Sequence, residues 1–114
     1  DGWDGPFTVG WIPERFTSVD GFKLDGMWCL FYNDETSPND LSIFVWDSEQ
    51  MPRINLEDFQ EVSKEKVQNS DAQVYFSAKH SIYMLLWAHN SYIIQIEGGN
   101  SQQEIIEIAK KIVI

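Results

Sequence analysis

The stretch "IEGGNSQQEIIEIAKK", residues 96–111, passes from an apolar strand through two glycines into a predicted helix. Ser101 and Glu104 have the Ser-x-x-Glu spacing of a capping box, in which side chains bind the first N–H groups of a helix. The apolar residues that follow recur at intervals of three and four and predict one apolar helix face: Ile105, Ile108, Ala109, Ile112 and Val113. The chain is therefore expected to end in an amphipathic helix that needs a surface to cover it.

A strand, a glycine loop and a helix N-terminus are also the parts of a phosphate site. Such a site requires Gly-x-x-x-x-Gly-Lys-Ser/Thr, or Gly-x-Gly-x-x-Gly between parallel strands. Gly98-Gly99-Asn100 has neither spacing, and the carboxylate of Glu104 would repel a phosphate. We therefore expect the glycines to reverse the chain at the edge of a sheet and lay the helix on it.

Upstream, apolar runs separated by turn residues predict an antiparallel sheet. The predicted strands are "MWCLFY", "LSIFVW", "EVSKEKVQ", "AQVYFSA", "IYMLLWA" and "YIIQIE". Short Asn/Ser turns join the last four, so we predict an α+β fold: a meander-like antiparallel sheet of about six strands with the C-terminal helix packed on one face. A single domain is expected to span residues 1–114.

Three stretches have less regular patterns than the other predicted strands. "FTSVDGFKL", residues 16–24, alternates weakly and predicts one or two short strands broken at Asp20-Gly21. In "NLEDFQEV", Asn55 is suited to cap a single helical turn. "EVSKEKVQ", residues 61–68, instead predicts an exposed edge strand whose lysines discourage pairing with other chains.

The bulk composition excludes several classes of partner. The 114 residues carry a net charge of -10 with only eight Lys and Arg, so a basic surface for nucleic acid or an anionic membrane is not expected. Cys29 is the only cysteine, so no internal disulfide can form. No run approaches the roughly 18 apolar residues of a membrane span. Because the sequence opens abruptly at "DGWDG", we expect a soluble piece of a longer protein.

Alternate side chains of a strand point to opposite faces of its sheet, so each strand divides into two sets. One set is mostly aliphatic and is expected to face the helix: Met27, Cys29, Phe31, Leu41, Ile43, Val45, Ala72, Val74, Phe76, Ile82, Met84, Leu86, Ile94 and Ile96. The other mixes rings with polar groups: Trp28, Leu30, Tyr32, Phe44, Trp46, Gln73, Tyr75, Tyr83, Leu85, Trp87, Gln95 and Glu97.

The second set suggests a ligand-binding aromatic face, because rings beside polar groups suit a lipid, peptide or glycan. Its candidate residues are Trp28, Tyr32, Phe44, Trp46, Tyr75, Tyr83 and Trp87. The alternative is that this face is also core and is covered by the N-terminal segment with Trp3, Trp11 and Phe16. The binding hypothesis fails if Trp46 and Trp87 are both fully buried.

Catalytic and metal chemistry finds little support in the sequence. His80 and His89 each fall at a predicted strand end, and neither His-x-x-x-His nor Cys-x-x-Cys occurs. The acidic loop at residues 33–40 lacks the ligand order of a calcium loop. Gly-x-Ser-x-Gly is absent. We therefore predict no catalytic residues, no metal site and no cofactor, and expect the chain not to be an enzyme.

Three stretches together resemble a known family: "WIPERF" at 11–16, "IYMLLWAHNSYIIQIEG" at 82–98 and "SQQEIIEIAKKI" at 101–112. They are similar to the bacterial domain of unknown function DUF4367. That family often has Gly where Arg15 stands, and often Gly at the turn formed here by Asn69-Ser70.

The resemblance implies a setting but no catalytic residues. Domains of this family lie at the extracytoplasmic C-terminal end of membrane-anchored proteins of Gram-positive bacteria, including anti-sigma-factor-like ones. It therefore implies a non-catalytic sensor or interaction domain outside the membrane, tethered by an N-terminal anchor that this sequence lacks. Its partner is expected to be a protein or a cell-envelope ligand, and the alternative function is a small module that binds a lipid, peptide or glycan through the aromatic face.

Overall fold

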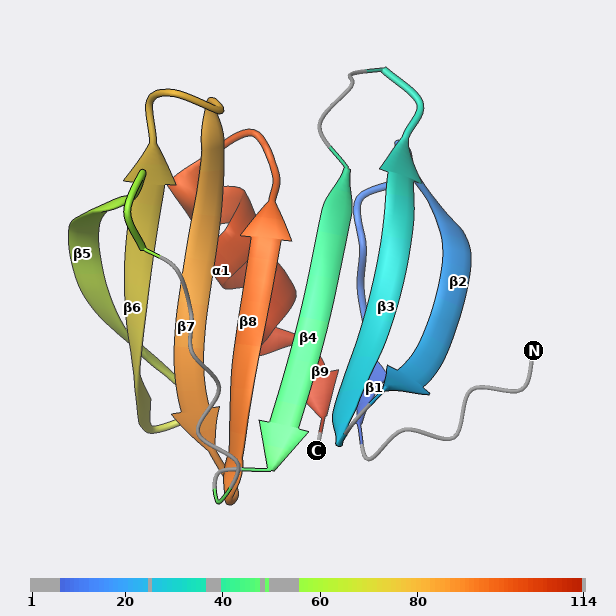
Figure 1. Ribbon diagram of the computed structural model, residues 1–114, viewed down its shortest axis with the longest axis vertical. Helices are drawn as coiled ribbons and strands as arrows, with labels where there is room; N and C mark the ends of the chain where they lie inside the picture. Colours follow the sequence, from blue (N-terminus) through green and yellow to red (C-terminus); the bar gives the residue numbers. More distant parts are fainter. Residues whose placement is uncertain (1–6, 25, 37–39, 48, 50–55, 114) are drawn as a thin grey trace.

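The computed structural model describes residues 7–24, 26–36, 40–47, 49 and 56–113 (Figure 1). Seven strands form one antiparallel sheet in the order β2-β3-β4-β8-β7-β6-β5, and β1 pairs with β9 in a separate two-stranded ribbon. The elements are β1 Thr8–Val9, β2 Phe16–Leu24, β3 Met27–Asp34, β4 Leu41–Asp47, β5 Gln60–Val67, β6 Ser70–Ser77, β7 Ile82–His89, β8 Tyr92–Gly98, α1 Gln102–Lys110 and β9 Ile112–Val113. The predicted fold class, an antiparallel sheet with a C-terminal helix, is confirmed.

The sheet consists of two meanders rather than one. The first meander is β2-β3-β4, the second is β5-β6-β7-β8, and β4 pairs with β8 instead of with β5. The break expected at Asp20-Gly21 does not occur, because β2 pairs with β3 along its whole length and a register shift between Ser18 and Asp20 absorbs the irregular pattern. The predicted edge position of residues 61–68 is confirmed by β5.

The second meander is closed by tight turns. Gln68-Asn69 and Asn90-Ser91 each form a two-residue loop with φ values of 49° and 68°, the left-handed conformation of a type I′ hairpin. The first of these turns lies one residue earlier than predicted, because Ser70 already pairs with Val67. The predicted cap Asn55 lies outside the described residues; residues 56–59 form a turn in which Phe59 N donates to Leu56 O (3.0 Å).

The corner before the helix forms as the sequence predicts. Gly98 has φ 125° and lies so close to β4 that an added Cβ would be 2.3 Å from the carbonyl oxygen of Asp40, so a side chain does not fit there. Ser101 caps α1, with its Oγ accepting the N–H of Glu104 (3.1 Å). The Glu104 carboxylate reaches back to the N–H of Asn100 (2.9 Å) and so occupies the place that an anion would take.

Helix α1 is shorter than the apolar pattern suggests. Ile105, Ile108 and Ala109 are buried as predicted, but Ile112 and Val113 belong to β9, where Val113 is 63% exposed. Lys111 ends the helix, and Gln68 Nε2 donates to the carbonyl oxygen of Ile112 (2.7 Å). No helix among the described residues is long and apolar enough to cross a membrane.

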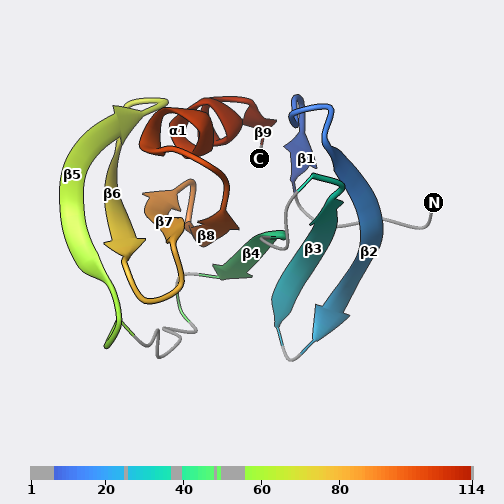
Figure 2. The same ribbon diagram turned by 90° about the horizontal axis from the view of Figure 1, so that it is seen from above.

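The core lies between the sheet and α1. Seen from above, the sheet curves around α1 and the β1–β9 ribbon, so the side that carries the helix is its inner side (Figure 2). The buried inner residues form one hydrophobic cluster that includes Leu41, Ile43, Val45, Val74, Leu85, Ile94, Ile96, Ile105 and Ile108. Phe7, just before β1, is also part of this cluster. Among the described elements, none that is helical lies on the opposite, outer side of the sheet (Figure 1).

Candidate functional site

The strand register shows on which side of the sheet each predicted face residue lies. On the inner side Leu30 pairs with Ile43, Ile43 with Ile96, and Ile96 with Leu85. Because alternate residues share a face, the seven candidate residues divide between the two sides of the sheet. Trp28, Tyr32, Tyr83 and Trp87 lie on the inner side, and Phe44, Trp46 and Tyr75 lie on the outer side. The single aromatic face predicted from the sequence is therefore wrong.

The four inner residues pack in or against the hydrophobic core. Trp87 is 1% exposed, and its Nε1 donates to the carbonyl oxygen of Val67 (3.1 Å). Trp28, Tyr32 and Tyr83 are half-buried against the same cluster. Burial also raises the pKa of Tyr32. These residues follow the alternative interpretation, in which strand aromatics are packing.

The N-terminal segment does not cover the predicted aromatic face in the way that the alternative interpretation expects. Phe16 is 8% exposed and belongs to the inner cluster, so it does not cover the outer side. Trp11 is 43% exposed. Trp3 lies outside the described residues.

A continuous aromatic row does exist on the outer side, over the first meander. It consists of Phe22 on β2, Phe31 on β3, and Phe44 and Trp46 on β4. Ring centroids are 5.7 Å apart between Phe22 and Phe31, 5.7 Å between Phe31 and Phe44, and 6.1 Å between Phe44 and Trp46. Phe22 is 38% exposed and the other three are half-buried. We call these four residues the aromatic row, and it is the candidate binding site.

Polar and small residues border the aromatic row. Gln95 of β8 lies opposite Phe44, and its Nε2 donates to Glu97 Oε2 (3.2 Å). Cys29 lies between Phe22 and Phe44 in the register and is 1% exposed. Burial raises the pKa of its thiol, which therefore stays protonated and packs as a small apolar group. Gln95 is 9% exposed and also donates to Met84 Sδ (3.1 Å), whereas Glu97 is half-buried. The site can thus bind by apolar and ring contacts, with the carboxylate of Glu97 on one side.

Sequence reasoning found Phe44 and Trp46 but missed Phe22 and Phe31. Both sets of alternate residues in "MWCLFY" are apolar, so the sequence of β3 does not tell which set faces the helix. Register could have supplied the signal, since antiparallel pairing of β2 with β3 places Phe22 beside Cys29 and so near Phe31.

A charge network joins the first meander to the helix. Arg15 Nε donates to Asp34 Oδ2 (2.9 Å), and its two terminal nitrogens donate to both carboxylate oxygens of Glu104, one of them at 2.6 Å. The pair with Glu104 raises the pKa of Arg15, and the hydrogen bonds from Arg15 lower the pKa of Glu104. Burial opposes ionisation of Asp34, but hydrogen bonds from Thr36 and Arg15 outweigh it and lower its pKa. Every member is paired, so the network is structural.

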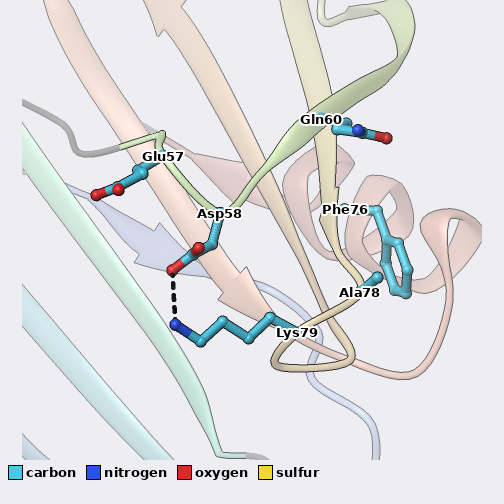
Figure 3. A pocket seen from close by; sticks show the side chains of 6 residues that line it. All are labelled: Glu57, Asp58, Gln60, Phe76, Ala78 and Lys79. Atoms are coloured by element: carbon cyan, nitrogen blue, oxygen red, sulfur yellow. Dashed lines mark ion pairs between the residues drawn. The ribbon is translucent and has the colours of Figure 1, made fainter.

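A small cavity of about 180 Å³ opens beside β5 and β6 (Figure 3). It is lined by Glu57, Asp58, Gln60, Phe76, Ala78 and Lys79. Asp58 and Lys79 point toward one another, with 3.7 Å between Oδ2 and Nζ, and His80 Nε2 lies 3.5 Å from the same oxygen. These side chains are 40% to 69% exposed, so this is a solvated ion cluster and we assign it no chemistry.

The two histidines do not meet. His80 lies in the turn before β7, whereas His89 ends β7, stacks on Trp87 (4.7 Å) and shares a 2.7 Å hydrogen bond with Ser70 Oγ. Across the residues that the structure describes, no three His, Cys, Asp or Glu side chains come together as metal ligands would.

Comparison with known proteins gives one result. No curated protein and no solved structure matches the chain. The model of one family covers residues 6–112, which span β1 to β8, the helix and the first residue of β9. The chain therefore belongs to the family described as a domain of unknown function, DUF4367.

Proposed function

We propose that this chain is a non-catalytic interaction domain that binds a protein partner through the aromatic row. The observation that carries the proposal is the unbroken contact of four rings across β2, β3 and β4, on the side of the sheet opposite α1. Aromatic residues that are partly exposed and mutually packed are typical of interface centres, because they supply large contact areas at little entropic cost.

The curvature of the sheet favours a protein over a small ligand. Sites for lipids and glycans are generally concave, whereas the aromatic row lies on the outer side of a sheet that curves toward α1 (Figure 2). A convex surface with a ring patch and a polar border suits a complementary protein surface. Binding of a lipid, peptide or glycan by the same row is the second candidate, supported by the half-buried carboxylate of Glu97 on β8 beside the row.

The setting that we propose for this interaction is the outer side of a bacterial membrane. There the domain would act as the sensor or interaction part of a membrane-anchored, anti-sigma-factor-like regulator of Gram-positive bacteria. Support comes from family membership together with the acidic net charge of -10, which keeps the domain off anionic lipid. The complete reading frame tests this setting: it should encode a membrane helix or lipoprotein signal upstream of Asp1, and its absence would overturn the anchored arrangement.

Site-specific photo-crosslinking in cells tests the binding surface. A benzophenone amino acid at Phe44 should capture one protein, and purified domain without the crosslinker should compete for it. The matched control places the same group at Tyr75, which lies on the same side of the sheet but in the second meander. Equal capture from both positions would show that the aromatic row is not the interface.

Tryptophan fluorescence distinguishes the second candidate. Trp46 is half-buried at one end of the row, so a bound lipid or glycan should change its emission. A response to zwitterionic phosphatidylcholine vesicles or to peptidoglycan fragments that is lost in Phe44→Ala would favour the small-ligand function. A silent panel combined with specific crosslinking would favour the protein partner.

A further inference from the structure

We propose that the free edge of β2 receives an extended, Lys- or Arg-flanked segment of the partner protein, which adds to the sheet as a further strand beside Phe22. This inference rests on the proposed function and names the chemistry of its partner. It concerns strand Phe16–Leu24, which ends one side of the sheet and, among the described elements, pairs only with β3. An exposed strand edge offers a row of backbone donors and acceptors, which is the basis of recognition by strand addition.

The two edges of the sheet are protected to different degrees. β5 carries charges of both signs at Glu61, Lys64, Glu65 and Lys66. It is also tied to α1, because Gln102 Nε2 donates to Ser63 Oγ (2.7 Å). Charged side chains, lysines above all, are the usual means of preventing edge pairing. β2 has only Asp20 and Lys23, and it exposes two apolar side chains, Val19 at 56% and Phe22 at 38%. The N–H of Gly21 in β2 donates to Asp20 Oδ1 (2.9 Å), and β5 exposes Val62 at 47%. The edge with fewer charged side chains is nevertheless that of β2, and it is the one that carries the aromatic row.

Strand geometry links this edge to the row. Neighbouring strands lie about 4.8 Å apart, and side chains of neighbouring strands on one face contact each other. A segment paired with β2 would therefore place a side chain beside Phe22 and extend the row, whose rings already follow one another at 5.7 Å from β4 to β2. The register shift between Ser18 and Asp20 confines regular pairing to residues 20–24.

The charged side chains around the β2 edge indicate which residues should flank the bound segment. Asp20 and Glu35 are exposed, and Thr17 Oγ1 holds Glu35 Oε1 beside β2 (2.8 Å). The ammonium group of Lys23 lies 4.9 Å from the ring of Trp28, on the inner side. The outer edge is therefore bordered by carboxylates and attracts Lys or Arg. A second copy of this chain, with its own net charge of -10, is disfavoured as the occupant.

A designed peptide tests the inference. The probe is Lys-Thr-Val-Thr-Phe-Thr-Val-Thr-Lys, with two comparison peptides: one with Glu in place of both Lys, and one with backbone N-methyl groups on alternate residues. The first peptide should bind with a Kd of about 1 mM or tighter and slow amide hydrogen exchange within residues 20–24. The Glu peptide should bind at least about tenfold more weakly, and the N-methylated peptide should give no protection.

Matched variants on the two edges complete the test. Val19→Lys should weaken binding of the Lys-flanked peptide several-fold, whereas Val62→Lys, at the equivalent register shift of β5, should leave it unchanged. Strand addition at β2 would be overturned by unchanged binding in Val19→Lys or by equal binding of the N-methylated peptide. It would also be overturned by protection of residues 60–67 instead of 20–24, or by no protection at all. If the peptide fails while crosslinking from Phe44 still captures a protein, the proposed function stands and only the strand-addition mode is wrong.

Discussion

The two meanders of the sheet differ in how they are supported and in what they present. In the second meander, two-residue turns connect β5 to β6 and β7 to β8, and the strands β5, β7 and β8 contact α1. The first meander is joined to the rest by β4–β8 pairing and by the Arg15 network, and its outer side carries the aromatic row. Stability is thus concentrated beneath the helix, and the surface that we propose for binding lies on the part with less support, as is common for binding regions.

The largest expected effect comes from emptying the core beneath the helix. Leu85→Ala in the second meander should lower the free energy of unfolding by about 3 to 4 kcal/mol, because Leu85 is fully buried and the surroundings are held by α1. Leu30→Ala in the first meander, where the side chain is 9% exposed, should cost about 2 kcal/mol. Urea denaturation measures both, and equal losses would contradict the difference between the meanders.

Breaking the Arg15 network should uncouple the first meander from the helix. Arg15→Met should lower the free energy of unfolding by about 2 kcal/mol, since it leaves the partly buried Glu104 carboxylate without its charged partner. Lys66→Met removes an exposed ion pair with Asp71 and should leave stability unchanged. Thermal unfolding followed by circular dichroism compares the two variants, and an equal response would show that the network does not join the meanders.

The same network predicts how stability depends on pH. The pKa values of Glu104 and Asp34 in the folded protein lie below their ordinary values of 4.5 and 3.8, so the unfolded chain takes up protons first as the pH falls. Their contribution is present above about pH 5 and is lost as the pH falls through the lowered folded values. Arg15→Met should reduce this loss between pH 5 and pH 3, as urea titrations at each pH would measure. A slope equal to that of the wild type would contradict the assignment.

The smallest effect concerns the tight turns of the second meander. Ser91 has φ 68°, where a side chain is unfavourable, so Ser91→Gly should stabilise the protein by about 0.5 kcal/mol. Ser42→Gly in the extended strand β4 of the first meander should instead destabilise it by about 1 kcal/mol. Chemical denaturation of the pair shows whether the turn conformation sets the sign of the change.

The sequence predicted the elements better than it predicted their faces. The Ser-x-x-Glu cap, the glycine corner and the lysine-bearing edge are local signals, and each lies where it was expected. The pairing of β4 with β8 depends on contacts between distant parts of the chain, which no local pattern encodes. Without that register, the sequence does not show which side of a doubly apolar strand faces the helix. The predicted aromatic face therefore combines residues from both sides of the sheet.

The position of β4 beside β8 also affects how the chain is made. Residues 41–47 leave the ribosome well before their partner strand, residues 92–98, has been synthesised. Until then the first meander has two unpaired edges and no helix over its inner side. Contacts between segments so far apart in sequence slow folding, and an exposed strand edge invites aggregation during that time. A chain truncated before Tyr92 should therefore accumulate as insoluble protein rather than as a smaller folded domain.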